Sequence, residues 1–108
     1  MVATSRVAYP EARAALARRQ REGGITRAAL PRTVSALDRD LERFIVVELS
    51  AKVARRAGEL AERRAPRGFD AIHLASALEV EQLTGATPSF WCFDDRLRQA
   101  ASVEGLSV

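Results

Sequence analysis

The chain has 108 residues, 47% of them apolar and 29% charged, which fits one folded domain over residues 1–108 and excludes intrinsic disorder. Its formal charge is +3, with 17 Lys and Arg against 14 Asp and Glu; this favours a polyanionic partner such as nucleic acid but also fits a biased genomic composition. No apolar run approaches the roughly 18–20 residues of a membrane span, and the first ten residues lack the order of a signal peptide, so we expect neither membrane contact nor export.

Two helices are predicted in the first part of the chain. From Ser5 to about Glu22, small and apolar residues recur at helical spacing, with Ser5 as candidate N-cap. Pro10 would remove a backbone donor in such a helix, so we expect a kink in its first turns. The second helix has Pro31 at its first position and an apolar stripe on one face, formed by Leu30, Val34, Leu37 and Leu41.

A short strand and two more helices follow. The β-branched run over residues 44–47 is typical of a buried strand, and Ser50 is predicted to cap the next helix. The inward residues of that helix are expected to be Val53, Ala57, Leu60 and Ala61. After a Pro and Gly break, a helix from about Phe69 to Leu83 is apolar on most sides, so it should lie at the centre of the domain.

The last part predicts a second clear strand over residues 89–93 and a fifth helix capped by Asp94 or Asp95. Short strands are also expected at residues 2–4 and 106–108. Strands separated by helices pair in parallel through right-handed crossovers. The predicted fold class is therefore α/β, an open sandwich of helices on a parallel sheet.

Three acids are candidates for one site. Asp94 lies at the end of a predicted strand, Asp70 opens the central helix, and Glu11 lies in the first helix beside apolar neighbours. Side chains at the carboxyl ends of parallel strands and on the following helices converge on one crevice. Converging carboxylates repel each other unless a cation lies between them, and Mg²⁺ or Mn²⁺ prefers oxygen ligands. Metal-assisted phosphodiester hydrolysis would follow from such a site.

Each acid also has a purely structural explanation. Helix capping accounts for Asp70 or Asp94 without any function, and Glu11 fits a solvated surface position. His73 lies three residues after Asp70 on one helix face, so a ligand role is possible; we favour a hydrogen-bonded structural histidine.

The aromatic residues and the cysteine near the third acid are not expected to do chemistry. Trp91 and Phe93 are predicted to be core residues rather than platforms for nucleic-acid bases. Cys92 is the single cysteine, which excludes an internal disulfide, and it lacks a second histidine that could activate it as a nucleophile. A chain without disulfides fits the reducing cytoplasm.

Three segments resemble motifs of the PIN-domain family, specifically its VapC-type toxins. The segment F-D-A-I-H-L-A-S-A at residues 69–77 resembles the family's D-A-x-H-L-A, and C-F-D-D-R-L at residues 92–97 resembles T-x-D-x-x-L. The run from Thr4 to Glu11 is similar to the T-S-x-x-x-x-x-E opening of a helix. Their order and spacing agree over nearly the whole chain.

The resemblance implies a three-layer α/β/α PIN fold and an endoribonuclease that depends on Mg²⁺ or Mn²⁺, cuts RNA and is blocked by a cognate antitoxin protein. A homodimer is also expected. Glu11, Asp70 and Asp94 would be the acidic metal and water ligands, and Asp95 could assist them. Ser5 and Cys92 would support the ligands from behind, with Cys92 in place of the family's usual Thr or Ser.

The sequence also departs from the family pattern. In the family a central first strand carries a further acid in a pattern like D-T/S-S-A, and that strand and the helices after it are absent from this sequence. We therefore expect an N-terminally incomplete domain: a start inside a longer frame, a decayed remnant, or a chain completed by another. Two hypotheses stay open, a ribonuclease that lacks one acid and a catalytically inert module that binds an antitoxin or dimerises.

Overall fold

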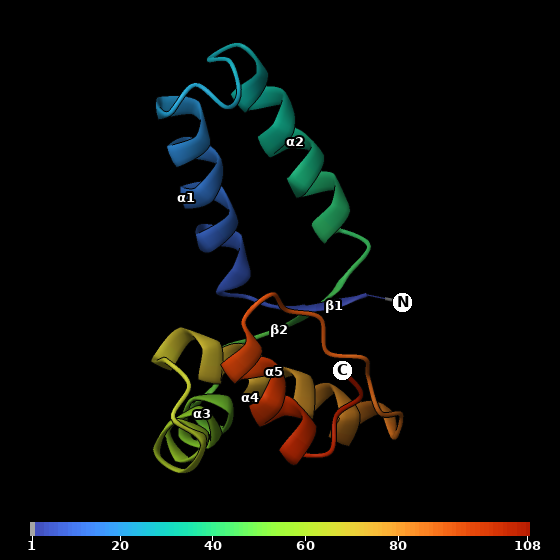
Figure 1. Ribbon diagram of the computed structural model, residues 1–108. Coiled ribbons are helices and arrows are strands. Elements are labelled where there is room, and N and C mark those ends of the chain that lie inside the picture. The colour runs from blue at the N-terminus through green and yellow to red at the C-terminus, as the bar shows by residue number, and fades with distance from the viewer. Residues whose placement is uncertain (1) are drawn as a thin grey trace.

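The computed structural model describes residues 2–108 and has three layers: two helices, a two-stranded sheet, and three more helices (Figure 1). Strands β1 (Ala3–Ser5) and β2 (Ile45–Val47) pair in parallel. In their register Ala3 lies opposite Ile45 and Ser5 opposite Val47. The predicted α/β class, with helices on both faces of a short parallel sheet, is confirmed.

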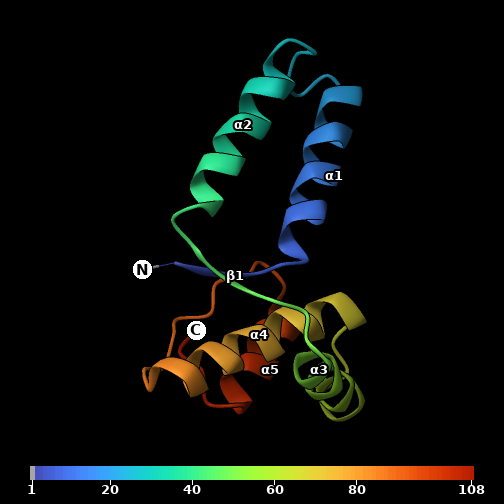
Figure 2. The same ribbon diagram turned by 180° about the vertical axis from the view of Figure 1, so that it is seen from behind.

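The crossover between the strands is a helical hairpin of α1 (Ala8–Arg21) and α2 (Ala29–Leu41). Both views show it standing away from the other helices (Figures 1 and 2). No residue of either helix is fully buried. The predicted stripe on α2 is half-buried, and the Tyr9 hydroxyl donates a hydrogen bond of 2.7 Å to Asp38, which joins the two helices. The hairpin is therefore held by its own contacts rather than by the core.

The start of α1 differs from the prediction. Ser5 is the last residue of β1, and its hydroxyl accepts a hydrogen bond of 3.3 Å from the Val7 amide instead of capping a helix. The helix begins at Ala8, so Pro10 is its third residue. Amides in a first helical turn have no partner inside the helix, so a proline there removes no helical hydrogen bond. The helix accordingly continues unbroken to Arg21.

The core is formed by α3 (Ala51–Arg64), α4 (Gly68–Thr84) and α5 (Asp95–Val103) beneath the sheet. The Ser50 hydroxyl accepts a hydrogen bond of 3.1 Å from the Val53 amide, which confirms the predicted cap of α3. Helix α4 packs against α3, α5 and both strands, so its predicted central place is also confirmed. None of the described helices is long and apolar enough to cross a membrane.

The predicted strand over residues 89–93 is wrong. Only a single parallel bridge forms there, between Ser89 and Ser107, with the Phe90 amide donating to the Ser107 carbonyl at 2.7 Å. Phe90 and Cys92 pack against the core, whereas Trp91 is 90% exposed and Phe93 fully exposed, at 109%. Side chains alternate along an extended segment, and here only one of its two faces is covered. The expectation that Trp91 and Phe93 lie in the core is therefore also wrong.

Candidate active site

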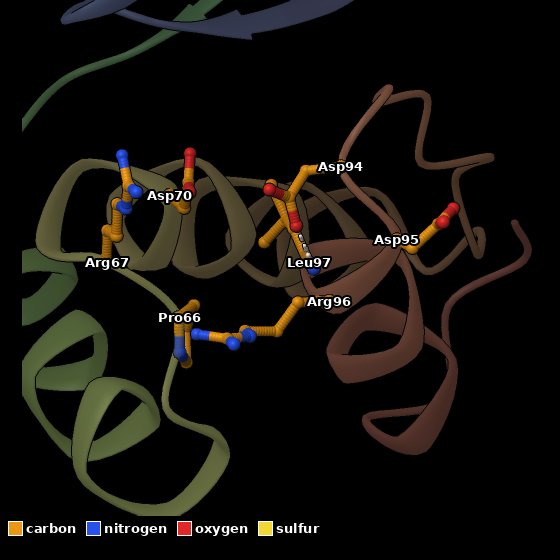
Figure 3. A pocket seen from close by; sticks show the side chains of 7 residues that line it. All are labelled: Pro66, Arg67, Asp70, Asp94, Asp95, Arg96 and Leu97. Atoms are coloured by element: carbon orange, nitrogen blue, oxygen red, sulfur yellow. Dashed lines mark hydrogen bonds between the residues drawn. The ribbon is translucent and has the colours of Figure 1, made fainter.

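Two of the three candidate acids line one pocket, where the start of α4 faces the start of α5 (Figure 3). The pocket has a volume of about 350 Å³ and is open to solvent. It is lined by Pro66, Arg67, Asp70, Asp94, Asp95, Arg96 and Leu97. Asp70 and Asp94 are 24 positions apart in the sequence, so it is the packing of α5 on α4 that brings them together.

Asp94 is the N-cap of α5. Its Oδ1 accepts a hydrogen bond of 2.9 Å from the Leu97 amide, so the capping explanation for this residue holds (Figure 3). Its Oδ2 makes no hydrogen bond within the described chain, which leaves one oxygen for a ligand. The Cys92 thiol lies 3.6 Å from the Asp94 carbonyl oxygen, so it contacts the backbone that carries this acid.

Asp70 has no structural task of that kind. It is the third residue of α4, and the N-terminus of that helix has no side-chain cap. Although Asp70 is half-buried, its carboxylate forms no hydrogen bond or ion pair with any residue from 2 to 108. The capping explanation therefore does not account for Asp70. A half-buried carboxylate without a protein partner is available to a cation or a donor from solution.

Glu11 lies outside this pocket but is not simply solvated. Its Oε1 lies 2.6 Å from Nε2 of His73, across from α1 to α4. This contact confirms the prediction of a hydrogen-bonded histidine. His73 follows Asp70 by three positions, so the two side chains lie on the same face of α4. Glu11 is therefore held beside the helix face that carries Asp70. Within residues 2–108, however, no three His, Cys, Asp or Glu side chains lie close enough together to hold one ion.

The other predicted residues lie at the margin of the site. Asp95 borders the pocket, but its carboxylate points away from Asp70 and Asp94 (Figure 3). Ser5 is buried at the end of β1, where its hydroxyl accepts a hydrogen bond from the Val7 amide. Neither residue touches the two pocket acids through a recorded hydrogen bond.

Sequence reasoning missed two arginines that share the pocket, Arg67 and Arg96. The Arg67 guanidinium stands beside Asp70, and Arg96 extends toward Pro66 (Figure 3). Neither arginine forms an ion pair with an acid of the described chain. A signal was present in the sequence, because Arg67 precedes Asp70 by three positions and Arg96 follows Asp94 by two. Exposed, unpaired guanidinium groups of this kind suit a phosphate ligand.

The donor set of the pocket fits a hard divalent cation. Mg²⁺ is usually held by one or two carboxylates, with waters and phosphate oxygens completing its shell. Asp70 and the free oxygen of Asp94 supply two such carboxylates, and the two arginines can hold the phosphate. Thiolate and imidazole ligands, which softer metals prefer, are absent from the lining of this pocket.

The chain matches the PIN domain family over residues 1–103. Two curated proteins of Mycobacterium tuberculosis are similar to it: Ribonuclease VapC45 of strain CDC 1551 / Oshkosh and Ribonuclease VapC49 of strain ATCC 25618 / H37Rv. Each is 43% identical over 109 residues, an alignment that covers 97% of this chain and 71% of the relative. No solved structure matches the chain significantly. The matched region includes the pocket and the Glu11–His73 pair.

Proposed function

Because the chain belongs to the PIN-domain family, among its VapC-type members, we propose that it is a divalent-metal-dependent endoribonuclease that hydrolyses RNA phosphodiester bonds. The observation that carries the proposal is the pocket in which Asp70 and Asp94 lie with the unpaired Arg67 and Arg96. Acids that hold a cation and arginines that hold a phosphate are the two kinds of group that phosphodiester hydrolysis requires.

Each side chain has a defined task in this proposal. Asp70 and Asp94 would hold Mg²⁺ or Mn²⁺, which when bound lowers the pKa of a water molecule and stabilises charge on the phosphate. Arg67 and Arg96 bind the phosphodiester and position it, without selecting a base sequence. The hydrogen bond from the Leu97 amide fixes one oxygen of Asp94, so the other oxygen of that carboxylate keeps a constant direction.

Four further residues have supporting tasks. Glu11 is the third acid, held beside α4 by His73. Asp95 assists at the rim of the pocket, whereas Ser5 shapes the turn before α1 and Cys92 supports the backbone of Asp94.

We further propose that residues 1–108 act as one domain in the cytoplasm, where RNA is available, and that a cognate antitoxin protein and a second copy of the chain are its protein partners. An apolar groove between α3 and α4 supports the existence of such a partner. It is lined by Leu49, Ala54, Ala57, Gly58, Ala61, Gly68, Phe69 and Ile72. Exposed apolar patches of this kind mark protein interaction sites.

The second candidate function is a catalytically inert module that binds an antitoxin or dimerises. The exposed Trp91 and Phe93 favour it, because large apolar side chains next to Asp94 suit contact with another protein. Such a module would bind its partner equally well without the pocket acids. An enzyme would lose cleavage when those acids are replaced.

The test is cleavage of a long heteropolymeric RNA by the purified chain in Mg²⁺, in Mn²⁺ and in excess EDTA. We expect cleavage with either metal, none in EDTA, and a loss of at least about 100-fold in Asp70→Asn, the size typical of removing a group that acts on the transition state. The matched control is Asp40→Asn, which changes an exposed aspartate of α2 and should cleave as the wild type does. Folded wild type that cleaves no RNA would support the inert module.

A further inference from the structure

The bond between Glu11 and His73 connects the least buried part of the molecule to the most buried part. Glu11 lies on the hairpin helix α1, which has no buried residue, and its side chain is 46% exposed. His73 lies on α4, and its own side chain is only 25% exposed. Its neighbour along the chain, Leu74, is fully buried. The histidine is thus attached to a helix with a buried face, and the glutamate to a helix without a buried residue.

The chemistry of the pair makes the histidine the donor. An ionised carboxylate only accepts hydrogen bonds, so we assign the donor role in the 2.6 Å contact with Oε1 of Glu11 to Nε2 of His73. Charge-assisted bonds to a carboxylate are shorter and stronger than neutral ones. Oε2 of Glu11 makes no hydrogen bond within residues 2–108. One oxygen of the carboxylate is therefore fixed and the other is free to bind a cation.

We propose that His73 is a positioning residue of the ribonuclease site: it fixes Glu11 of the hairpin beside the helix of Asp70, and it acts on the reaction only through that carboxylate. This inference rests on the proposed function. Without His73 the half-exposed Glu11 side chain loses the hydrogen bond that holds it beside α4. Hydrogen-bond partners of metal-ligating carboxylates typically contribute 10–100-fold to metal affinity or activity.

A simple tether between hairpin and core is the competing explanation for the same bond. A tether contributes to the stability of the fold, whereas a positioning residue also changes how tightly the site holds a cation. The two explanations therefore differ in metal affinity and in the split between kcat and KM.

The experiment measures the Mn²⁺ dissociation constant by EPR of free Mn²⁺, the unfolding midpoint, and kcat and KM for RNA. The variants are His73→Leu, His73→Gln, Glu11→Gln and the double variant His73→Leu/Glu11→Gln. Glutamine retains an N–H donor near the position of Nε2 and leucine does not. Tyr9→Phe is the matched control, because it removes another hydrogen bond of the hairpin without contact to Glu11.

We expect His73→Leu to weaken Mn²⁺ binding and lower kcat by roughly 10–100-fold with KM unchanged, and His73→Gln to stay near the wild type. In the double variant His73→Leu should add no loss to that of Glu11→Gln. A Mn²⁺ affinity of His73→Leu equal to that of Tyr9→Phe and the wild type, in a wild type that cleaves RNA, would overturn this inference alone. Folded wild type that neither binds Mn²⁺ nor cleaves RNA would overturn the proposed function, and this inference with it.

Discussion

Asp94 divides its two carboxylate oxygens between structure and proposed chemistry. Oδ1 accepts a hydrogen bond from the Leu97 amide and so caps the start of α5, while Oδ2 is left free to bind a ligand in the pocket. Asparagine is as good an N-cap as aspartate, but it carries no charge. The two tasks can therefore be separated by substitution at this one position.

We expect Asp94→Asn to abolish RNA cleavage while the free energy of unfolding stays close to that of the wild type. Asp94→Ala should abolish cleavage and also destabilise the fold by about 1 kcal/mol, the usual cost of losing an N-cap. Urea unfolding monitored by circular dichroism, together with the cleavage assay, checks both changes. Full cleavage by Asp94→Asn would show that Asp94 is only a cap.

The site was predictable from the sequence to the extent that it depends on acids next to element ends. Asp70 could be named because it opens a predicted helix, and Asp94 because it ends a predicted strand, although that strand does not form. Arg67 and Arg96 lie close to these acids in the sequence, but arginines are frequent in this chain, and it took the tertiary packing to select these two. The partner of His73 was also out of reach, because it lies 62 positions away in the sequence.

An ion cluster joins the end of helix α5 to helix α3. Arg63 and Arg64 of α3 donate to one oxygen of Glu104, at 3.1 and 3.0 Å. These hydrogen bonds hold the pKa of Glu104 below its usual range, and the one from Arg63 has the largest effect. Partial burial of the carboxylate acts in the opposite direction. A carboxyl whose pKa is lower in the folded state stabilises the fold above its unfolded pKa and loses that effect as pH falls.

The expected result is that wild type is more stable than Glu104→Gln at pH 7 and that the difference disappears as pH falls through and below about 4.3, the usual glutamate pKa. The difference should be small, because both arginine side chains are partly exposed. Urea unfolding of both proteins at pH 7 and at low pH measures it. A difference that grows on acidification would have the wrong sign for this cluster.

The hairpin should be the least stable element of the molecule. Helices α1 and α2 contain no buried residue, whereas α4 contains Ala71, Leu74 and Ala75 with no exposed surface. Regions with few buried apolar contacts open at low free energy. We expect amides of α1 and α2 to exchange with deuterium much faster than those of α4, as mass spectrometry of peptides would show. Equal protection of α1 and α4 would contradict this.

The helices were more predictable than the strands, for a physical reason. The apolar stripe of α3 recurs along the sequence, so Val53, Ala57 and Leu60 could be placed inside before any contact was known. The segment from Ser89 to Phe93 has the composition of a strand, but a strand also needs a neighbour to pair with. In the described chain that neighbour is the single residue Ser107.

The whole molecule is a layered body with one projecting hairpin, 42 Å in its longest extent against 27 and 25 Å in the others. Its α/β class was predictable, since strands and helices alternate in the sequence. The positions of the three acids in the molecule were not predictable. Asp70 and Asp94 line one pocket of the body, whereas Glu11 lies on the hairpin. The hairpin thus holds its acid outside the pocket, beside the helix that carries Asp70.

In the proposed function, the pocket between α4 and α5 binds a divalent cation through Asp70 and Asp94. The most direct test is Mn²⁺ binding to the purified chain, measured by EPR, in wild type, in Asp70→Asn/Asp94→Asn and in the control Asp38→Asn/Asp40→Asn, which removes the same charge from α2. We expect wild type and control to bind Mn²⁺ alike and the pocket variant to bind it at least about tenfold more weakly. Equal binding by all three folded proteins would contradict it.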